Sequence, residues 1–323
     1  MIKKIAVIGA GTMGHSIALN FSIYGYDVNL YDTNSTRIAN VEEEIKEELE
    51  FLAEEEFIEP SEIMKALSNI CYFTDLQEAV MDRDYVIEAA PEILKLKQEL
   101  FQKLDEFCLD HTILASNTSS LNLESMMALI SNDRRKKMIV NHWYNPGHIM
   151  PIVELSFFGN MPEDIYLKVE HLYKSINKQC VKVLKDIPGL VANRIQQGVA
   201  REVFSIIEQG IAAPEDIDKA LQFGPAFRYA TTGQLEIADL GGLDIWCTVG
   251  DNLLKVMDNS LSANSLLRRK VEEGKLGLKS GEGFFKYNQE NSSEIRKRFI
   301  QKLIHQLKAS EYYVEKKTFL NNI

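Results

Sequence analysis

The hydrophobic positions in the first half of the chain fall into short, nearly continuous runs, and stretches with helical spacing separate most of them. Short apolar runs are typical of strands that are buried on both faces of a parallel sheet. Because strands and helices alternate, the pattern predicts an α/β fold with a Rossmann-type doubly wound sheet. The predicted strands are residues 5–8, 26–31, 70–73, 85–90, 112–116, 138–142, 152–155 and 181–184.

This alternation ends at residues 185–189, where proline and glycine interrupt the pattern. Apolar positions beyond the break recur at helical spacing, so we expect an all-helical C-terminal domain. The apolar stripe of residues 190–209 needs a partner surface in so small a domain, which favours a homodimer. The predicted parts are a sheet domain at 1–187 with a helical insertion at about 36–67, a helical domain at 188–288, and a helical extension at 289–323.

Three glycines follow the first predicted strand directly, and a helical pattern follows them. Gly9 permits a tight turn, Gly11 lets the backbone approach a pyrophosphate, and Gly14 allows the helix to pack closely on the strand. Asp32 ends the second strand, where its carboxylate can bind ribose hydroxyls and would repel a 2′-phosphate. The sequence therefore predicts a dinucleotide site that prefers NAD to NADP. The loop residues are Gly9, Ala10, Gly11, Thr12, Met13 and Gly14.

His142 stands at the end of a later strand, and Glu154 lies in the next strand after a short loop. Ligands of an open α/β sheet bind beyond the carboxyl ends of its strands, which puts His142 on the cofactor side. Imidazole can act as a base in one direction and an acid in the other, and a neighbouring carboxylate stabilises its charged form. We therefore predict that these two residues transfer the proton. The other histidines are interpreted as structural: His15, His111, His148, His171 and His305.

Composition limits the partners that the chain can have. The 323 residues carry a formal net charge of −11, which argues against a nucleic-acid or anionic-membrane partner. No apolar stretch approaches the length of a membrane span. The first strand begins almost at once, so no signal peptide is expected. The four cysteines show no metal-like spacing and are expected to be buried thiols, which favours the cytoplasm.

Several motifs together resemble the NAD-dependent 3-hydroxyacyl-CoA dehydrogenases over residues 1–288; besides the glycine loop they are the segments 115–121, 142–146, 151–154, 185–194 and 279–285. The resemblance implies that His142 and Glu154 form the catalytic pair. It further implies that Ser119 and Asn193 contact the substrate near its reacting oxygen, and that the helical domain forms a homodimer. Beyond the glycine loop, the residues implied in NAD contact are Asp32, Glu92, Lys97, Asn117, Ser119, Asn145 and Lys279.

The activity implied by the resemblance is the NAD-dependent interconversion of an L-3-hydroxyacyl-CoA and its 3-oxoacyl-CoA, a reaction of fatty acid metabolism. An alternative is the oxidation of a small free hydroxy acid such as gulonate, carnitine or hydroxybutyrate. Glutamates dominate residues 36–57, where relatives that bind CoA place basic residues toward its phosphates. Arg228 resembles a residue of relatives that act on free acids, and its planar group suits a carboxylate, although pairing with Glu236 would make it structural.

A third interpretation is a non-catalytic, NAD-binding protein similar to the lambda-crystallins, which share this family's sequence pattern. Such a protein would not need an intact proton-transfer pair. The presence of His142, Glu154 and Ser119 therefore favours an enzyme.

Overall fold

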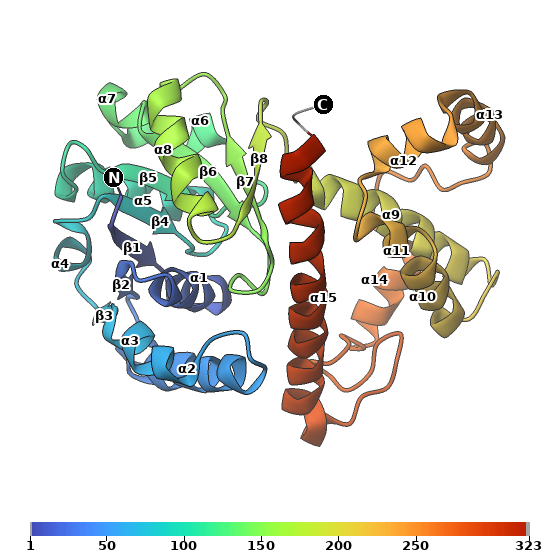
Figure 1. Ribbon diagram of the computed structural model, residues 1–323, viewed down its shortest axis with the longest axis horizontal. Helices are drawn as coiled ribbons and strands as arrows, with labels where there is room; N and C mark the ends of the chain where they lie inside the picture. Colours follow the sequence, from blue (N-terminus) through green and yellow to red (C-terminus); the bar gives the residue numbers. More distant parts are fainter. Residues whose placement is uncertain (1, 321–323) are drawn as a thin grey trace. The chain divides into compact units, whose positions relative to one another are not determined.

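The computed structural model describes residues 2–320 and consists of two compact units, Met1–Val191 and Ala192–Ile323. The first unit is an eight-stranded sheet with helices on its faces, and the second unit is helical (Figure 1). These observations confirm the predicted fold class, a Rossmann-type doubly wound sheet followed by an all-helical domain.

The strands of the first unit are arranged in the order β3-β2-β1-β4-β5-β6-β7-β8, and all neighbours are parallel except β6 and β7. The chain passes from β3 at one edge back to β4 beside β1, which creates a switch point beyond the carboxyl ends of β1 and β4. The strands are β1 (Lys4–Ile8), β2 (Asp27–Tyr31), β3 (Ile70–Phe73), β4 (Tyr85–Glu88), β5 (Ile113–Ser116), β6 (Met138–Trp143), β7 (Ile152–Ser156) and β8 (Gln179–Val183).

Helices and 3-10 turns connect these strands, among them the long α2 and the short α3. The helical elements are α1 (Thr12–Ile23), α2 (Ser35–Glu54), η1 (Pro60–Glu62), α3 (Ile63–Ser68), α4 (Leu76–Val80), α5 (Leu94–Phe107), α6 (Leu123–Met126), η2 (Met127–Leu129), α7 (Asn132–Arg135) and α8 (Glu163–Lys174).

The core lies on both faces of the central strands, because successive side chains of a strand point to opposite faces. On one face, Val86 of β4 packs in the same buried cluster as Phe101 of α5. On the other face, Phe21 of α1 and Tyr173 of α8 surround Trp143 of β6, with ring centroids 5.6 and 5.5 Å from the indole. Both faces of the central strands are therefore buried away from water, which explains the continuous apolar runs in the sequence.

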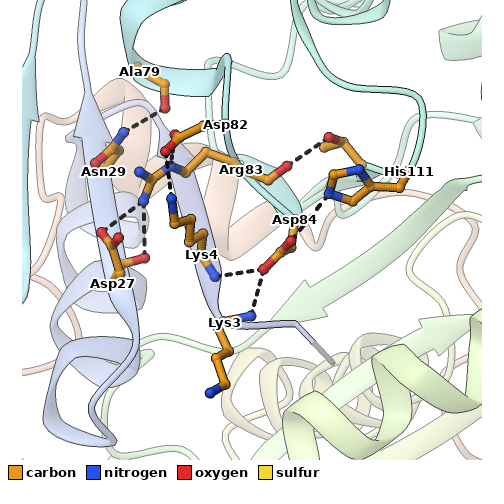
Figure 2. Close-up of polar contacts among 10 residues, drawn as sticks. Lys3, Lys4, Asp27, Asn29, Ala79, Asp82, Arg83, Asp84 and His111 are labelled. Atoms are coloured by element: carbon orange, nitrogen blue, oxygen red, sulfur yellow. Dashed lines mark hydrogen bonds and ion pairs between the residues drawn. The ribbon is translucent and has the colours of Figure 1, made fainter.

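Charged residues gather at the amino-terminal edge of the sheet, opposite the carboxyl ends of the strands (Figure 2). Asp84 accepts hydrogen bonds from the backbone N–H groups of Lys3 and Lys4 at 2.8 and 2.9 Å. Arg83 pairs with Asp27 at 2.8 Å. These contacts connect the starts of β1, β2 and β4. The charged residues at this edge therefore stabilise the sheet, and ligands can bind at the opposite edge, beyond the carboxyl ends of the strands.

The second unit consists of α9 (Ala192–Glu208), α10 (Pro214–Phe223), α11 (Pro225–Tyr229), α12 (Gln234–Gly241), α13 (Leu243–Leu253), α14 (Ser265–Glu272), η3 (Gln289–Asn291) and α15 (Ser292–Leu320). Phe204 of α9 stacks on Phe284 in the segment before α15, with ring centroids 5.6 Å apart. Among residues 2–320, no helix combines the length and the apolar composition that crossing a membrane requires.

Two details depart from the sequence-based expectations. Helix α8 occupies a segment between β7 and β8 for which no element was predicted. The thiols of Cys71 and Cys247 are exposed, so the expectation of buried cysteines was wrong for these two, whereas Cys108 is buried. Cys71 lies on the edge strand β3, where one side of the strand has no neighbour.

Candidate active site

The glycine loop joins β1 to α1 at the carboxyl edge of the sheet. Gly9 has a φ of +103°, and a Cβ on it would lie 2.9 Å from the carbonyl oxygen of Ala89. A Cβ on Gly14 would overlap the carbonyl oxygen of Gly9, so only glycine permits this approach of helix to loop. A Cβ on Gly11 would meet no atom within 4 Å, which leaves open space in front of that residue.

The amino end of α1 has free donors that face this space. Gly11 is the N-cap residue, and no side chain caps the helix. The first N–H groups of a helix have no partner within it and carry partial positive charge, so this end suits an anionic pyrophosphate.

Asp32 lies at the end of β2, next to the loop. Its carboxylate accepts a hydrogen bond from the Ala10 N–H at 2.9 Å and one from the Asn34 N–H at 2.9 Å. The carbonyl of Ala10 accepts a bond from Arg37 Nε at 2.6 Å, and the guanidinium of Arg37 also pairs with Glu44. The sequence reasoning did not identify Arg37, although a basic residue shortly after Asp32 was the available signal. Because Glu44 neutralises the positive charge of Arg37, the carboxylate of Asp32 still makes this end of β2 negative.

His142 and Glu154 stand directly opposite each other in the antiparallel pair of β6 and β7. Their side chains therefore share one face, and Nδ1 of His142 lies 2.8 Å from Oε2 of Glu154, with both groups buried. The other carboxylate oxygen of Glu154 accepts a hydrogen bond from the Val191 N–H at 2.8 Å. Since Nδ1 must donate to the carboxylate, Nε2 carries the lone pair and faces the hydroxyl of Ser119 at 3.1 Å. The arrangement leaves Nε2 able to take up a proton.

The loop after β5 carries Ser119, and the carboxylate of Glu92 holds this loop. One oxygen of Glu92 accepts hydrogen bonds from the hydroxyl of Thr118 at 2.5 Å, from the N–H groups of Ser119 and Ser120 at 3.1 Å, and from the Ser120 hydroxyl at 3.0 Å. Partial burial opposes ionisation, but the hydrogen bonds from Thr118 and Lys97 outweigh it and lower the pKa of Glu92 to about 2. Glu92 therefore fixes the position of Ser119 as an ionised group.

Beneath this loop lies an ion pair that the sequence reasoning missed. Lys97 Nζ is 2.9 Å from both carboxylate oxygens of Glu88 and 3.0 Å from Glu92, and the Lys97 and Glu88 side chains are only 1% and 0% exposed. Ser116 donates a further bond to Glu88 at 2.6 Å. Burial raises the pKa of Glu88 above its ordinary value, while the positive charge of Lys97 acts against this rise. Lys97 thus contacts both Glu88 of β4 and Glu92, and Glu92 in turn holds the loop that carries Ser119.

The other residues predicted for the site lie in separate places. Asn117 directly follows β5 and accepts a hydrogen bond from the Trp143 N–H at 2.8 Å, and Asn145 is exposed in the loop after β6. In the second unit, Asn193 is half-buried in the first turn of α9, and Lys279 is exposed in a turn. Arg228 is exposed on α11, and among the described residues it forms no ion pair with Glu236 or any other acid.

These features fit a dinucleotide with a free 2′-hydroxyl. The open space at Gly11 and the uncapped start of α1 suit the pyrophosphate, and Asp32 is half-exposed where a ribose would be bound. The dinucleotide supplies or accepts a hydride, and the pair of His142 and Glu154 can move the accompanying proton.

Comparison with known proteins places both units in one family. The NAD-binding domain of 3-hydroxyacyl-CoA dehydrogenase matches residues 4–187, and the C-terminal domain of 3-hydroxyacyl-CoA dehydrogenase matches residues 189–287.

Individual relatives agree with this assignment. The chain is 31% identical over 304 residues to 5-formyl-3-hydroxy-2-methylpyridine 4-carboxylate 5-dehydrogenase of Mesorhizobium japonicum, which covers 94% of this chain and 97% of that protein. It is 34% identical to 3-hydroxybutyryl-CoA dehydrogenase of Clostridioides difficile, covering 88% of this chain and 99% of the relative. Among solved structures, a 5-formyl-3-hydroxy-2-methylpyridine 4-carboxylic acid 5-dehydrogenase superposes with a TM-score of 0.88 at 30% identity, covering 96% of this chain and 99% of that one. The chain therefore belongs to the 3-hydroxyacyl-CoA dehydrogenase family, NAD-dependent oxidoreductases that act on a CH–OH group.

Proposed function

We propose that this protein interconverts an L-3-hydroxyacyl-CoA and the corresponding 3-oxoacyl-CoA, as its relatives named 3-hydroxybutyryl-CoA dehydrogenase do. The observation that carries the chemistry is the sequence of contacts from Glu154 to His142 to Ser119, at 2.8 and 3.1 Å. A dehydrogenase needs one group that removes the hydroxyl proton and one that orients the reacting oxygen, and these contacts supply both.

When bound, NAD would supply the acceptor for the hydride that leaves carbon 3 of the substrate. Nε2 of His142 takes the hydroxyl proton as the C–H bond breaks, so the alcohol becomes a ketone and the proton stays on the imidazole. Glu154 stabilises the imidazolium through its 2.8 Å contact with Nδ1. Ser119 donates a hydrogen bond to the substrate oxygen, and Asn193 is proposed to do the same. In the reverse reaction His142 returns the proton.

We propose that the NAD contacts implied by the resemblance act around this centre. Asp32 binds the adenosine ribose, and Asn117, Asn145 and Lys279 contact the nicotinamide half. For Glu92 and Lys97 the described contacts support an indirect role, because both are occupied in positioning the loop with Ser119.

A small carboxylated substrate is the second candidate, and the charge of α2 favours it. Glu42, Glu43, Glu47 and Glu50 are exposed on this helix, where they would repel CoA phosphates.

A substrate panel with the purified protein distinguishes these candidates. We expect NADH formation from 3-hydroxybutyryl-CoA, with Arg228→Ala unchanged in kcat/KM. If the substrate is instead a free acid, Arg228→Ala removes a charge-assisted bidentate contact, and kcat/KM falls by roughly 10- to 150-fold.

The panel pairs 3-hydroxybutyryl-CoA with free 3-hydroxybutyrate, gulonate, carnitine and a pyridine carboxylate bearing an aldehyde. Arg228→Lys is the matched variant, because it keeps the charge but loses the planar fork. Activity confined to free acids would contradict the CoA proposal, and no NADH formation with any of them would favour the non-catalytic interpretation.

We infer that the helical unit forms a homodimer, as the apolar surface of α12 and α13 indicates. These two helices lie together at one end of the second unit (Figure 1). No residue of α13 is buried, and its apolar side chains Leu243, Ile245, Trp246, Val249 and Leu253 are all exposed. A contiguous apolar surface of this kind marks an interaction site, and a second copy is its commonest partner.

Light scattering at micromolar concentration should give twice the chain mass of 36.8 kDa. Trp246→Glu should shift the mass toward a single chain, because a buried charge without a partner disfavours association. The control is Met64→Glu, which alters an exposed apolar residue of the first unit. A wild-type mass of one chain would contradict the dimer.

We also infer a cytoplasmic location. All four cysteines are free thiols, and two of them are exposed. Exposed thiols persist in a reducing compartment, whereas an oxidising one favours disulfides.

A further inference from the structure

A buried polar junction connects the glycine loop, α2 and the loop after the catalytic strand. It consists of His15, Ser16, Glu48 and His148; both histidines are less than one-tenth exposed, whereas the Glu48 side chain is 30% exposed. The sequence reasoning interpreted both histidines as structural. His15 lies in the first turn of α1, one residue after Gly14, so it is part of the same turn that offers its N–H groups to the cofactor.

Both ring nitrogens of His15 face acceptors. Nδ1 lies 2.8 Å from the carbonyl oxygen of Gly11, and Nε2 lies 3.0 Å from Oε1 of Glu48. A carbonyl oxygen and a carboxylate can only accept, so both ring nitrogens must carry hydrogen, which makes His15 an imidazolium. The Gly11 carbonyl also accepts the His15 backbone N–H at 3.1 Å, so this residue holds the N-cap peptide by two bonds.

His148 is held in the opposite protonation state. Its backbone N–H donates to the hydroxyl of Ser16 at 3.0 Å, and the hydroxyl in turn lies 2.8 Å from Nδ1 of His148. The hydroxyl can accept the backbone bond and donate to Nδ1, which is the arrangement that a neutral His148 ring requires. Burial lowers the pKa of His148 to about 4, in agreement with this assignment. Of the two histidines, only His15 carries charge near neutral pH.

We propose that the imidazolium of His15, paired with Glu48, is a positioning residue for NAD that makes cofactor affinity depend on pH. It orients the Gly11 peptide so that the N–H groups of α1 stay directed at the pyrophosphate, and it offsets the charge of Glu48 behind the loop. When His15 loses its proton, the carboxylate of Glu48 loses its hydrogen-bonded counter-charge, and only the more weakly acting Arg37 still offsets the negative charge behind the loop. The proposal rests on NAD binding at the glycine loop and is independent of the substrate.

The charged and titratable groups around His15 set the direction of the effect. Burial alone would lower the pKa of His15, but the hydrogen bond and charge of Glu48 outweigh it, so the pKa lies above the ordinary 6.5. Arg37 on α2 acts in the opposite direction. The buried Lys178 lies near the neutral His148 and lowers its pKa further. Oε2 of Glu48 forms no hydrogen bond among the described residues and lies 3.8 Å from His148 Nδ1, so His15 is the main compensation for this carboxylate.

The test measures the Kd of NADH by fluorescence between pH 6 and 9.5, without substrate. Wild-type affinity should weaken by about threefold to tenfold as pH rises through the pKa of His15, because the charge is lost there. His15→Gln should bind NADH weakly at every pH and lose that dependence. Glu48→Gln keeps an acceptor for Nε2 without the charge, so its transition should move to lower pH. The double variant should recover part of the affinity, since neither charge remains.

Glu47→Gln is the matched control, because it removes an equal charge from an exposed position on the same helix. Melting temperatures show that each variant is folded, and NMR titration of the His15 ring gives its pKa directly. If the Glu48→Gln transition coincides with that of the wild type, or if His15→Gln keeps the wild-type pH dependence, the proposal is wrong. Failure of wild-type protein to bind NADH at any pH would instead contradict the cofactor assignment.

Discussion

Replacing His142 with glutamine should lower kcat by about 10²- to 10⁴-fold, the usual contribution of a positioned general acid–base group. Glutamine can still donate a hydrogen bond to Glu154, but it cannot take up the hydroxyl proton. The Kd of NADH, measured by fluorescence, should stay close to the wild-type value, because His142 lies on β6 and the glycine loop follows β1. The loss should therefore be confined to turnover.

Glu154→Gln should reduce kcat less, since an amide oxygen can still accept from Nδ1 but does not stabilise the imidazolium. His111→Gln is the matched control, because this exposed histidine contacts Asp84 at the amino-terminal edge of the sheet (Figure 2). Turnover near the wild-type rate in the His142 variant would contradict the assigned role. A parallel loss in His111→Gln would point to general damage.

Lys97→Met should lower the free energy of unfolding by about 3–5 kcal/mol, the range for removing one partner of a buried ion pair. The substitution leaves Glu88 without its counter-charge in a site with 0% exposure and removes one partner of Glu92 as well. Denaturant unfolding followed by circular dichroism measures this change. The variant should also lose turnover, because Glu92 then holds the Ser119 loop less firmly.

Lys95→Met provides the comparison on the same helix, since its side chain is 87% exposed and its ion pair with Glu99 is loose at 3.9 Å. Its stability should change by less than about 0.5 kcal/mol. The double variant Lys97→Met with Glu88→Gln should recover part of the loss, because no unpaired charge remains in the core. A change of less than about 1 kcal/mol in Lys97→Met would show that Glu88 is neutral or reached by water.

The sheet and the glycine loop could be predicted because each depends on a local pattern. The strands are buried on both faces, so their apolar runs are continuous, and the glycines follow one of them directly. Helix α8 was missed although signals were present. Pro162 precedes it, and Glu163 and Asp164 occupy its first turn, where acidic residues are favourable.

The supporting parts of the site could not be predicted in the same way. The pair of His142 and Glu154 could be predicted, because only a short loop separates the two strands that carry it and because a histidine beside a carboxylate indicates proton transfer. The contact of Glu92 with Ser120 joins residues 28 positions apart, and that of His15 with Glu48 joins residues 33 positions apart. Such contacts depend on how helices pack against the sheet, and no periodicity in the sequence encodes them.

The cross-strand pairing of His142 with Glu154 also bears on how this enzyme can evolve. The register of β6 and β7 sets the spacing of the two side chains, and neither side chain of the pair lies in the connection formed by residues 144–151. Changes in that connection, outside Asn145 and His148, can reshape the surroundings of a substrate while the 2.8 Å contact persists. An insertion within either strand would instead turn one of the two side chains to the other face of the sheet. New substrates are therefore more accessible to this fold through loop variation than through any change in its proton-transfer pair.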